Sequence, residues 1–406
     1  MEICSHDKCT GCYACVNACP HGCISMEEDA LGAVHPVVNE SKCVHCNLCI
    51  KTCPNNASLE FKYPIKCYAS WITDSEKRKK CASGGIGTIM SEYVIKQGGV
   101  VFGSRYDENL TPIMTYAETL DELEYFKGSR YVQSLVGNDT FKQVRSFLNE
   151  DRLVLFIGTP CQIAGLKTFL RKDYDNLVTV DLICHGVCPT EYLKEEVEYL
   201  SNKYGLKDVS DIRFRGNDGN DYRLTLWDKY GRKLFPSNNY REKIFLTQDI
   251  QQYYINGFIL GISLRNNCYS CNYAKPERIS DITIGDFIGL GKTIPFDFSL
   301  KNVSSVLINT TKGNVFYEDL SNEIKSLENI LRTYEERLEY KPSLQHPFLR
   351  HPLSGKFGEE FIKYGYTLAI RKTLKGYLLK RRFCLLFKFS FYRVPHKLLN
   401  LCHIKG

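Results

Sequence analysis

Three features are missing from this 406-residue sequence, and each absence excludes a class of protein. Met1 is followed at once by a charged, cysteine-rich segment rather than an apolar signal stretch, so we expect a cytoplasmic chain. No apolar run in the carboxyl-terminal segment approaches the ~20 residues of a membrane span, which argues against a transmembrane helix there. That segment, residues 361–406, also lacks Asp and Glu, and its 11 Lys and Arg residues give it a charge of +11.

The charge is therefore divided unevenly between body and tail. Because the whole chain carries +7, the 360 residues before the tail sum to −4. Such a body offers no extended basic face, and we expect no nucleic-acid partner. In the tail, basic and apolar residues alternate, which suits the inner face of an anionic membrane and a peripheral location. The alternative is a helical extension packed on the body, with its lysines in solvent.

The 19 cysteines are the most informative component of the sequence. A chain of this length does not need disulfides to replace a hydrophobic core. Cysteines grouped at short, regular intervals are instead typical of thiolate metal ligands in a reducing compartment.

Two cysteine runs near the amino terminus share the spacing C-x2-C-x2-C-x3-C-P. They are Cys9, Cys12, Cys15 and Cys19 before Pro20, and Cys43, Cys46, Cys49 and Cys53 before Pro54. In ferredoxins with two 4Fe-4S clusters, the fourth cysteine of each run binds the other cluster. We therefore pair the first three cysteines of each run with Cys53 and Cys19 respectively. Zinc is the alternative metal, but zinc sites present two separated C-x2-C pairs. Cys4 and Cys23 fall outside the pattern and are expected to be spare buried thiols.

A glycine-rich segment introduces the first long helix of the body. The segment contains Ser83, Gly84, Gly85 and Thr88, and helical spacing follows over residues 89–96. Gly98 and Gly99 end this helix, and a strand starts at Val100. Free N–H groups at the positive end of a helix suit a phosphate, although many helices simply begin with glycine.

A second polar run combines a cation, hydroxyls, an aromatic ring and an amide. These are the groups that a flavin requires for its phosphates, ring face and ring edge. The run comprises Lys127, Gly128, Ser129, Arg130, Tyr131, Gln133 and Ser134.

Further cysteines follow two predicted strands. The apolar segment 153–157 ends at Thr159, Pro160 and Cys161, a helix is expected next, and the strand 178–183 ends at Cys184 and His185. Strand, helix and strand at this spacing predict a parallel βαβ unit. Both cysteines then lie at carboxyl ends of strands, where α/β sheets place ligand sites.

Taken together, these motifs resemble those of the coenzyme F-420 hydrogenase/dehydrogenase beta-subunit family, in the form with a fused ferredoxin domain. The resemblance covers about residues 1–290. It is carried by the Ser83–Gly85 segment, the Lys127–Ser134 run, Thr159 to Cys161, Cys184 to Gly186, the pair Cys268 and Cys271, and Asp281–Asp286.

The resemblance implies a third 4Fe-4S cluster next to FAD. By position, its ligands would be Cys161, Cys184, Cys268 and Cys271. Cys188 stands where relatives tend to have proline, so it competes with Cys184 as a ligand. His185 would be a catalytic proton donor or hydrogen-bond donor near the flavin, with structural pairing as the alternative. Arg215 and Lys292 are candidates to hold an anionic substrate.

The expected fold is of the α+β and α/β classes. It has a two-cluster ferredoxin-like domain (1–60), an α/β flavin-binding body in two parts (61–150 and 151–345, the second with the third cluster) and a basic amphipathic helical tail (346–406). The expected function is oxidoreduction: electrons pass between the clusters and FAD, and hydride passes to or from coenzyme F-420 or another small molecule, with a redox protein as partner. The alternative is a non-catalytic electron-transfer module serving a separate enzyme. The hydride acceptor, the direction of electron flow and the role of residues 291–406 stay open.

Overall fold

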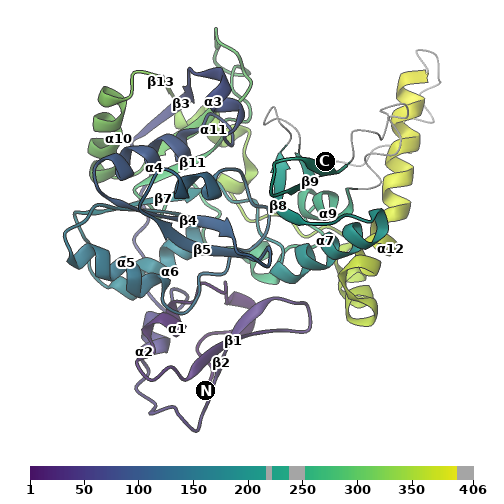
Figure 1. The fold of residues 1–406 in the computed structure, drawn as a ribbon, viewed down its shortest axis with the longest axis horizontal. Helices are drawn as coiled ribbons and strands as arrows, with labels where there is room; N and C mark the ends of the chain where they lie inside the picture. The colour runs from purple at the N-terminus through teal and green to yellow at the C-terminus, as the bar shows by residue number, and fades with distance from the viewer. Residues whose placement is uncertain (216–221, 237–251, 391–406) are drawn as a thin grey trace.

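The computed structural model describes residues 1–215, 222–236 and 252–390, with only the backbone of 381–390. It contains a small N-terminal domain, a large mixed sheet covered by helices, and a smaller lobe that carries the C-terminal helix (Figure 1). Residues 391–406, the end of the predicted tail, lie outside the described residues. The mixed α/β architecture agrees with the fold class expected from the sequence.

The N-terminal domain is built almost entirely from loops around its cysteines. Its two strands form an antiparallel hairpin, and each of its short helices begins between two cysteines of one run. The elements are η1 (His6–Lys8), α1 (Ala14–Ala18), β1 (Ile24–Glu28), β2 (Val34–Val38) and α2 (Leu48–Thr52). Helix α1 packs on α5 and α6 of the body, which places this domain against one face of the large sheet (Figure 1).

The large sheet has eight strands in the order β13-β3-β12-β11-β7-β6-β4-β5. Its centre is parallel, because β11 pairs with β7, β7 with β6 and β6 with β4 in that direction, while the outer pairs are antiparallel. The strands are β3 (Lys66–Ile72), β4 (Val100–Tyr106), β5 (Pro112–Ala117), β6 (Val154–Gly158), β7 (Leu177–Leu182), β11 (Ile282–Asp286), β12 (Ser304–Ile308) and β13 (Leu327–Arg332). Both predicted parts of the body, 61–150 and 151–345, therefore contribute strands to one sheet.

The central strands are buried on both faces, as parallel strands usually are. Side chains alternate between the faces: Val101 and Leu155 pack toward α4 and α10, and Phe102 and Phe156 pack toward α5 and α6. The predicted βαβ unit is confirmed, since β6 and β7 pair in parallel and α6 connects them.

Helices and 3-10 turns cover both faces of the sheet and form most of the smaller lobe. They are α3 (Ser75–Lys79), α4 (Ile86–Lys96), η2 (Glu122–Phe126), α5 (Thr140–Asn149), α6 (Pro160–Leu170), α7 (Thr190–Tyr204), α9 (Tyr253–Ile259), η3 (Asn266–Ser270), α10 (Thr311–Glu323), α11 (Tyr334–Glu339), η4 (Pro342–Leu344) and α12 (Ser354–Ser390).

The smaller lobe combines a three-stranded sheet with α7, α9 and α12. Its strands, in the order β10-β9-β8, are β8 (Val209–Arg215), β9 (Tyr222–Asp228) and β10 (Lys233–Phe235). Helix α12 bends at Gly365, whose φ of 72° suits glycine, and the Glu195 carboxylate accepts the Thr367 N–H just beyond the bend. Among the described residues, no helix has the length and apolar character needed to cross a membrane.

Candidate functional site

The N-terminal domain gathers its cysteines into two sets of four. Each set joins three closely spaced cysteines of one run to the last cysteine of the other run, as the spacing predicts. The thiols of the first set interact electrostatically with one another. The thiols of the second set line one small pocket. We call them set one (Cys9, Cys12, Cys15 and Cys53) and set two (Cys19, Cys43, Cys46 and Cys49).

The loops of both runs have the same backbone conformation. Gly11 and Tyr13 in the first loop, and His45 and Asn47 in the second, have left-handed φ values of 53° to 63°. Where helical and left-handed residues alternate, successive backbone N–H groups point into one concave surface. Such a surface binds anions, including iron–sulfur clusters. Burial raises the pKa of Cys12 to about 12, so a bound metal is needed to hold the thiolate form. The donor set and the loops both fit 4Fe-4S clusters.

The two cysteines outside the motifs border these sets. The sulfur of Cys23 lies 3.4 Å from that of Cys19, and Cys4 lies within hydrogen-bonding reach of Cys9 and Cys53. Each set therefore has a fifth thiol beside it. Cys23 is buried, as expected for a spare thiol, whereas Cys4 is only partly buried.

A third set of four cysteines converges from three parts of the body. Cys161 lies in the first turn of α6, Cys184 follows β7, and Cys268 and Cys271 lie in and just after η3. Cys268 interacts electrostatically with the other three thiols, so all four face a common space. We call these residues set three.

The structure separates the two candidates for the strand-end ligand. Cys188 is fully buried in the smaller lobe, where its sulfur lies 3.4 Å from the Ser263 hydroxyl. Cys184 instead interacts with Cys161 and Cys271, and its sulfur accepts the Gly186 N–H at 3.4 Å. The geometry therefore groups Cys184, rather than Cys188, with set three.

Tyr273 borders both set one and set three. Its buried side chain interacts electrostatically with Cys12 and Cys53 of set one and with Cys161 and Cys271 of set three. Helix α6 also makes close contact with set one, because a Cβ at Gly165 would lie 3.0 Å from the Cys12 sulfur. The two thiol sets are therefore neighbours across the boundary between the N-terminal domain and the body.

The same boundary contains a buried arginine. Arg265 donates hydrogen bonds to the carbonyls of Cys9 and Val34 in the N-terminal domain, at 3.3 and 3.1 Å. It also donates to the Gln133 side chain at 2.6 Å, and Gln133 in turn donates to the Thr10 carbonyl at 3.3 Å. These bonds fix set one against the body.

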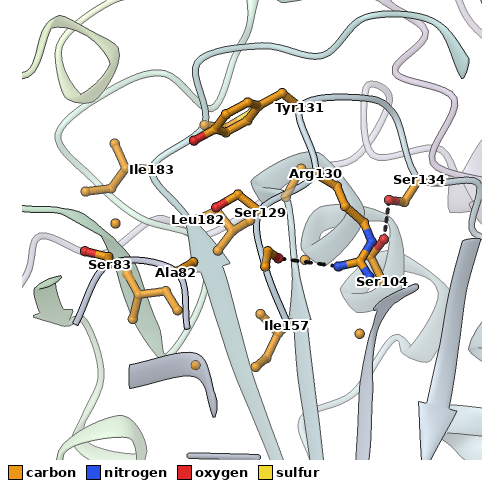
Figure 2. Close-up of a pocket in the computed structure, with 18 of the residues that line it drawn as sticks. Ala82, Ser83, Ser104, Ser129, Arg130, Tyr131, Ser134, Ile157, Leu182 and Ile183 are labelled. Atoms are coloured by element: carbon orange, nitrogen blue, oxygen red, sulfur yellow. Dashed lines mark hydrogen bonds between the residues drawn. The ribbon is translucent and has the colours of Figure 1, made fainter. Parts of the chain in front are cut away.

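A cavity of about 550 Å³ opens at the carboxyl ends of the central strands. Figure 2 shows side chains from several segments pointing into it, among them Ser83, Ser129, Tyr131 and Ile157. This is the position in which open α/β sheets bind ligands, and the volume is typical of a cofactor site. Cys184 of set three also lines the cavity, so the third thiol set lies at its wall.

Most of the sequence-predicted cofactor residues line this cavity. Those that do are Ser83, Thr88, Lys127, Gly128, Ser129, Arg130, Tyr131, Ser134 and Thr159, and His185, the predicted catalytic residue, lines it as well. Helix α4 contributes its first turn, and its N-cap residue Gly85 makes no side-chain capping bond. Within the part of the chain that the structure describes, no side chain caps the backbone N–H groups of that turn, which can therefore bind an anion in the cavity.

The other predicted cofactor residues have structural positions. Gly84 packs against the sheet, where its N–H donates to the Ser304 hydroxyl at 2.9 Å. Gly85 is the left-handed N-cap of α4, with φ of 84°, and Pro160 is the first residue of α6. Gln133 lies at the domain boundary rather than in the cavity.

The polar run from Lys127 to Tyr131 is held in place by its own arginine. The Arg130 guanidinium donates to the carbonyls of Tyr125 and Phe126, at 2.6 and 3.3 Å, and lies over the Tyr106 ring. Nearby, Ser104 and Ser134 share a hydrogen bond of 2.6 Å (Figure 2). Arg130 thus shapes the loop, and Ser129 is left to face the cavity.

A charged cluster borders the cavity where the smaller lobe meets the large sheet. The Asp286 carboxylate, at the end of β11, binds the Arg215 guanidinium and accepts the Tyr222 hydroxyl at 3.2 Å. Arg215 also donates to the Tyr131 hydroxyl at 3.1 Å. Burial would raise the pKa of Asp286, but Arg215 and the hydrogen bonds outweigh burial, and the pKa lies below its usual value.

His185 occupies a largely apolar part of the cavity wall. It packs against the Phe258 and Phe348 rings, and its Nε2 lies 3.1 Å from the Phe258 carbonyl. Burial, followed by the charge of Lys341, lowers the pKa of His185 to about 4. The ring is therefore neutral at pH 7 with its proton on Nε2, because the carbonyl can only accept.

Four residues near the site were not identified by sequence reasoning as binding residues: Arg265, Tyr273, Asp286 and Lys341. Asp286 lay within a recognised motif, and the others lay in segments without a local pattern. Lys292, which the sequence offered as an anion-binding candidate, is exposed and lies over the Tyr340 ring, 4.9 Å from its centroid.

Comparison with known proteins gives two family matches. Residues 151–330 match the family described as the C terminus of the "Coenzyme F420 hydrogenase/dehydrogenase, beta subunit", and residues 8–57 match the "4Fe-4S dicluster domain". No curated protein matches the chain. One solved structure that it resembles is a chain of the F420-reducing NiFe hydrogenase complex from Methanosarcina barkeri. That chain is 18% identical, with a TM-score of 0.45, and the match covers 80% of this chain and 96% of that one.

Proposed function

We propose that this chain is an iron–sulfur flavoprotein oxidoreductase, because residues 151–330 match the coenzyme F-420 hydrogenase/dehydrogenase beta-subunit family and residues 8–57 match the 4Fe-4S dicluster domain. It would pass electrons between three 4Fe-4S clusters and FAD, and hydride to or from coenzyme F-420 or another small organic molecule. The position of Cys184 carries the proposal, since this residue belongs to set three and also lines the cavity.

Under this proposal, the three thiol sets would act as one electron-transfer series. Set two faces solvent, because Val44 is 58% exposed and Cys46 is exposed. Set one follows in the same domain, and Tyr273 connects it to set three. A redox protein that docks on the loop around Val44 would therefore exchange electrons at the end of the series farthest from the cavity.

The cavity supplies groups suited to FAD. The uncapped first turn of α4, with Lys127 and Ser129, would hold the phosphates, and Tyr131 and the apolar walls would hold the ring. A flavin exchanges single electrons with iron–sulfur centres and a hydride with organic substrates.

The chain's own residues prepare the cavity for this chemistry. Arg130 fixes the loop that presents Ser129 and Tyr131, and Arg215 orients the Asp286 carboxylate and the Tyr131 hydroxyl. Phe258 and Phe348 pack against His185, whose neutral ring has its proton on Nε2 and leaves Nδ1 as a hydrogen-bond acceptor. Apolar packing of this kind would limit water around a reactive hydride donor.

Anaerobic purification followed by iron, acid-labile sulfide and flavin analysis tests the proposal. We expect about 12 irons and one FAD per chain, since three 4Fe-4S clusters hold four irons each. Turnover of an organic acceptor by the chain alone would then separate an enzyme from a module that serves another protein. About 8 irons without flavin would support only the dicluster module and contradict the oxidoreductase.

We also propose that the outer face of α12 contacts an anionic membrane surface. Leu368 and Leu379 are 50% and 46% exposed, and the exposed Lys372 and Lys375 lie between them on the same face. Exposed apolar side chains beside lysines match the apolar boundary and anionic headgroups of a bilayer. The absence of Asp and Glu from residues 361–406 strengthens this complementarity.

A further inference from the structure

Lys341 is a cavity residue in a part of the chain that carries no sequence motif. It follows α11 and directly precedes η4, and its side chain lines the cavity. Two buried neighbours hold this segment in place: Leu344 is fully buried, and Arg337 donates to the Asp286 carbonyl at 2.8 Å. The position of the lysine is therefore set by packing on both sides.

The Lys341 ammonium lacks a partner. Within residues 1–215, 222–236 and 252–390, no hydrogen bond or ion pair involves its Nζ. The other cavity lysine differs, because Lys127 forms an ion pair with Glu124. Lys341 is partly buried, and burial, followed by the charge of Arg337, lowers its pKa, while the charges of Asp286 and Cys184 oppose this shift.

Cations outnumber carboxylates around Lys341. The largest charges that act on it are those of Arg337, Asp286, Cys184 and Arg215, and Asp286 is the carboxylate among them. Arg215 and Tyr222 already bind this carboxylate. An incoming anion would therefore gain a charge-assisted hydrogen bond in a site of low polarity.

The lysine lies near the thiol set rather than the uncapped helix turn. Lys341 interacts electrostatically with Cys184 and His185. Lys127 instead interacts with Cys81, and the Cys81 thiol is within hydrogen-bonding reach of Thr88 in the first turn of α4. The two cavity lysines therefore serve different regions. Under the proposed function, the phosphates of FAD would lie at α4, which leaves Lys341 for a second ligand.

We propose that Lys341 binds an anionic oxygen group, a carboxylate or a phosphate, of the organic electron acceptor. The inference rests on the proposed oxidoreductase function and deepens it: the substrate class is an anion, and Lys341 is its specificity-determining contact beside His185. The anionic group that Lys341 binds could instead be a phosphate of FAD, and the experiment below distinguishes the two ligands.

The test compares wild type with Lys341→Met, Lys341→Arg and, as a matched control, Lys292→Met, all as purified full-length protein with reconstituted clusters and FAD. Oxalate and inorganic phosphate are the probes, titrated calorimetrically at constant ionic strength. We expect saturable binding of at least one probe to wild type, a loss of about tenfold or more in Lys341→Met, and retention in Lys341→Arg. The exposed Lys292→Met should match wild type.

Affinity for FAD, measured by fluorescence titration, identifies the source of the anion. The proposal expects Lys341→Met to bind FAD within about twofold of wild type, because the phosphates lie at α4. A tenfold loss of FAD affinity would assign Lys341 to the cofactor and overturn the proposal. It would also be overturned if neither probe binds wild type, or if Lys341→Met binds both as wild type does.

These outcomes are distinct from failure of the proposed function. If the chain binds no FAD, the oxidoreductase proposal fails, but calorimetry on the FAD-free protein still decides whether Lys341 binds an anion. If FAD binds and is reduced normally, but oxalate and phosphate bind Lys341→Met as tightly as wild type, only the anion proposal fails.

Discussion

The Arg265 guanidinium donates a hydrogen bond of 2.6 Å to the side-chain oxygen of Gln133, and both side chains are buried where the N-terminal domain meets the body. Each of the two residues also bonds backbone carbonyls of the N-terminal domain, those of Cys9 and Val34 for Arg265 and of Thr10 for Gln133. The contact therefore sets the position of set one relative to set three. These hydrogen bonds join the two domains at a buried junction.

Arg265→Met should weaken this junction. The substitution leaves buried carbonyls without donors, and we expect a loss of about 2–4 kcal/mol in the free energy of unfolding. Chemical denaturation of the cluster-loaded protein measures it. Arg350→Met is the control, because Arg350 is exposed, donates to the Asn266 side chain at 3.1 Å and lies over the Tyr269 ring, all outside the N-terminal domain. Equal destabilisation by the two variants would show that the junction has no special role.

Substitutions of cysteines test the composition of set three. Cys271→Ser should lose about 4 of about 12 irons, because it removes a ligand of one cluster. Cys188→Ser should retain about 12 irons per chain, because the Cys188 thiol lies against Ser263 in the smaller lobe rather than in set three. Iron analysis and electron paramagnetic resonance of the reduced protein measure both. Loss of a cluster in Cys188→Ser would contradict the assignment.

These ligand sets show what the sequence could predict. The spacing of Cys9 to Cys53 specifies which thiols meet, because the ligands lie on short loops and the chemistry of the metal demands four of them. The strand and helix around Cys161 are equally local, since an apolar run and a helical period define them.

Contacts between distant segments could not be predicted in this way. Gln133 was expected to bind a flavin, because an amide near a loop suits a cofactor as well as it suits a buried arginine, and only the tertiary structure distinguishes these uses. Lys341 and Arg265 have no local pattern around them. Their positions result from the packing of α11 and from the docking of the N-terminal domain.

Gly87 provides a test of the cavity. It lies in the first turn of α4 and lines the cavity, and a Cβ there would meet Ile284 at 3.4 Å. In Gly87→Leu, the side chain would occupy cavity space beside the free N–H groups, and we expect FAD affinity to fall by about tenfold or more.

Gly355→Leu is the matched control, because Gly355 lies in the first turn of α12 with open space around it. Fluorescence titration measures FAD affinity, and iron content checks that the clusters remain. Unchanged affinity in Gly87→Leu would place the flavin elsewhere.

Charged substitutions on α12 test its proposed membrane contact. Leu368→Glu with Leu379→Glu should reduce flotation with anionic liposomes severalfold, because the changes remove apolar contact and add negative charge. Val315→Glu on α10, where Val315 is 53% exposed, is the control. Equal flotation of all three proteins would show that α12 does not contact the membrane.

The most direct test of the central claim is the rate at which reduced ferredoxin reduces the bound flavin, followed anaerobically by stopped-flow absorbance. Set three lies between set one and the cavity, so Cys271→Ser should slow flavin reduction by roughly tenfold or more relative to wild type, while the N-terminal clusters are still reduced. Reduction at the same rate in both proteins, or no flavin reduction in wild type, would contradict the account.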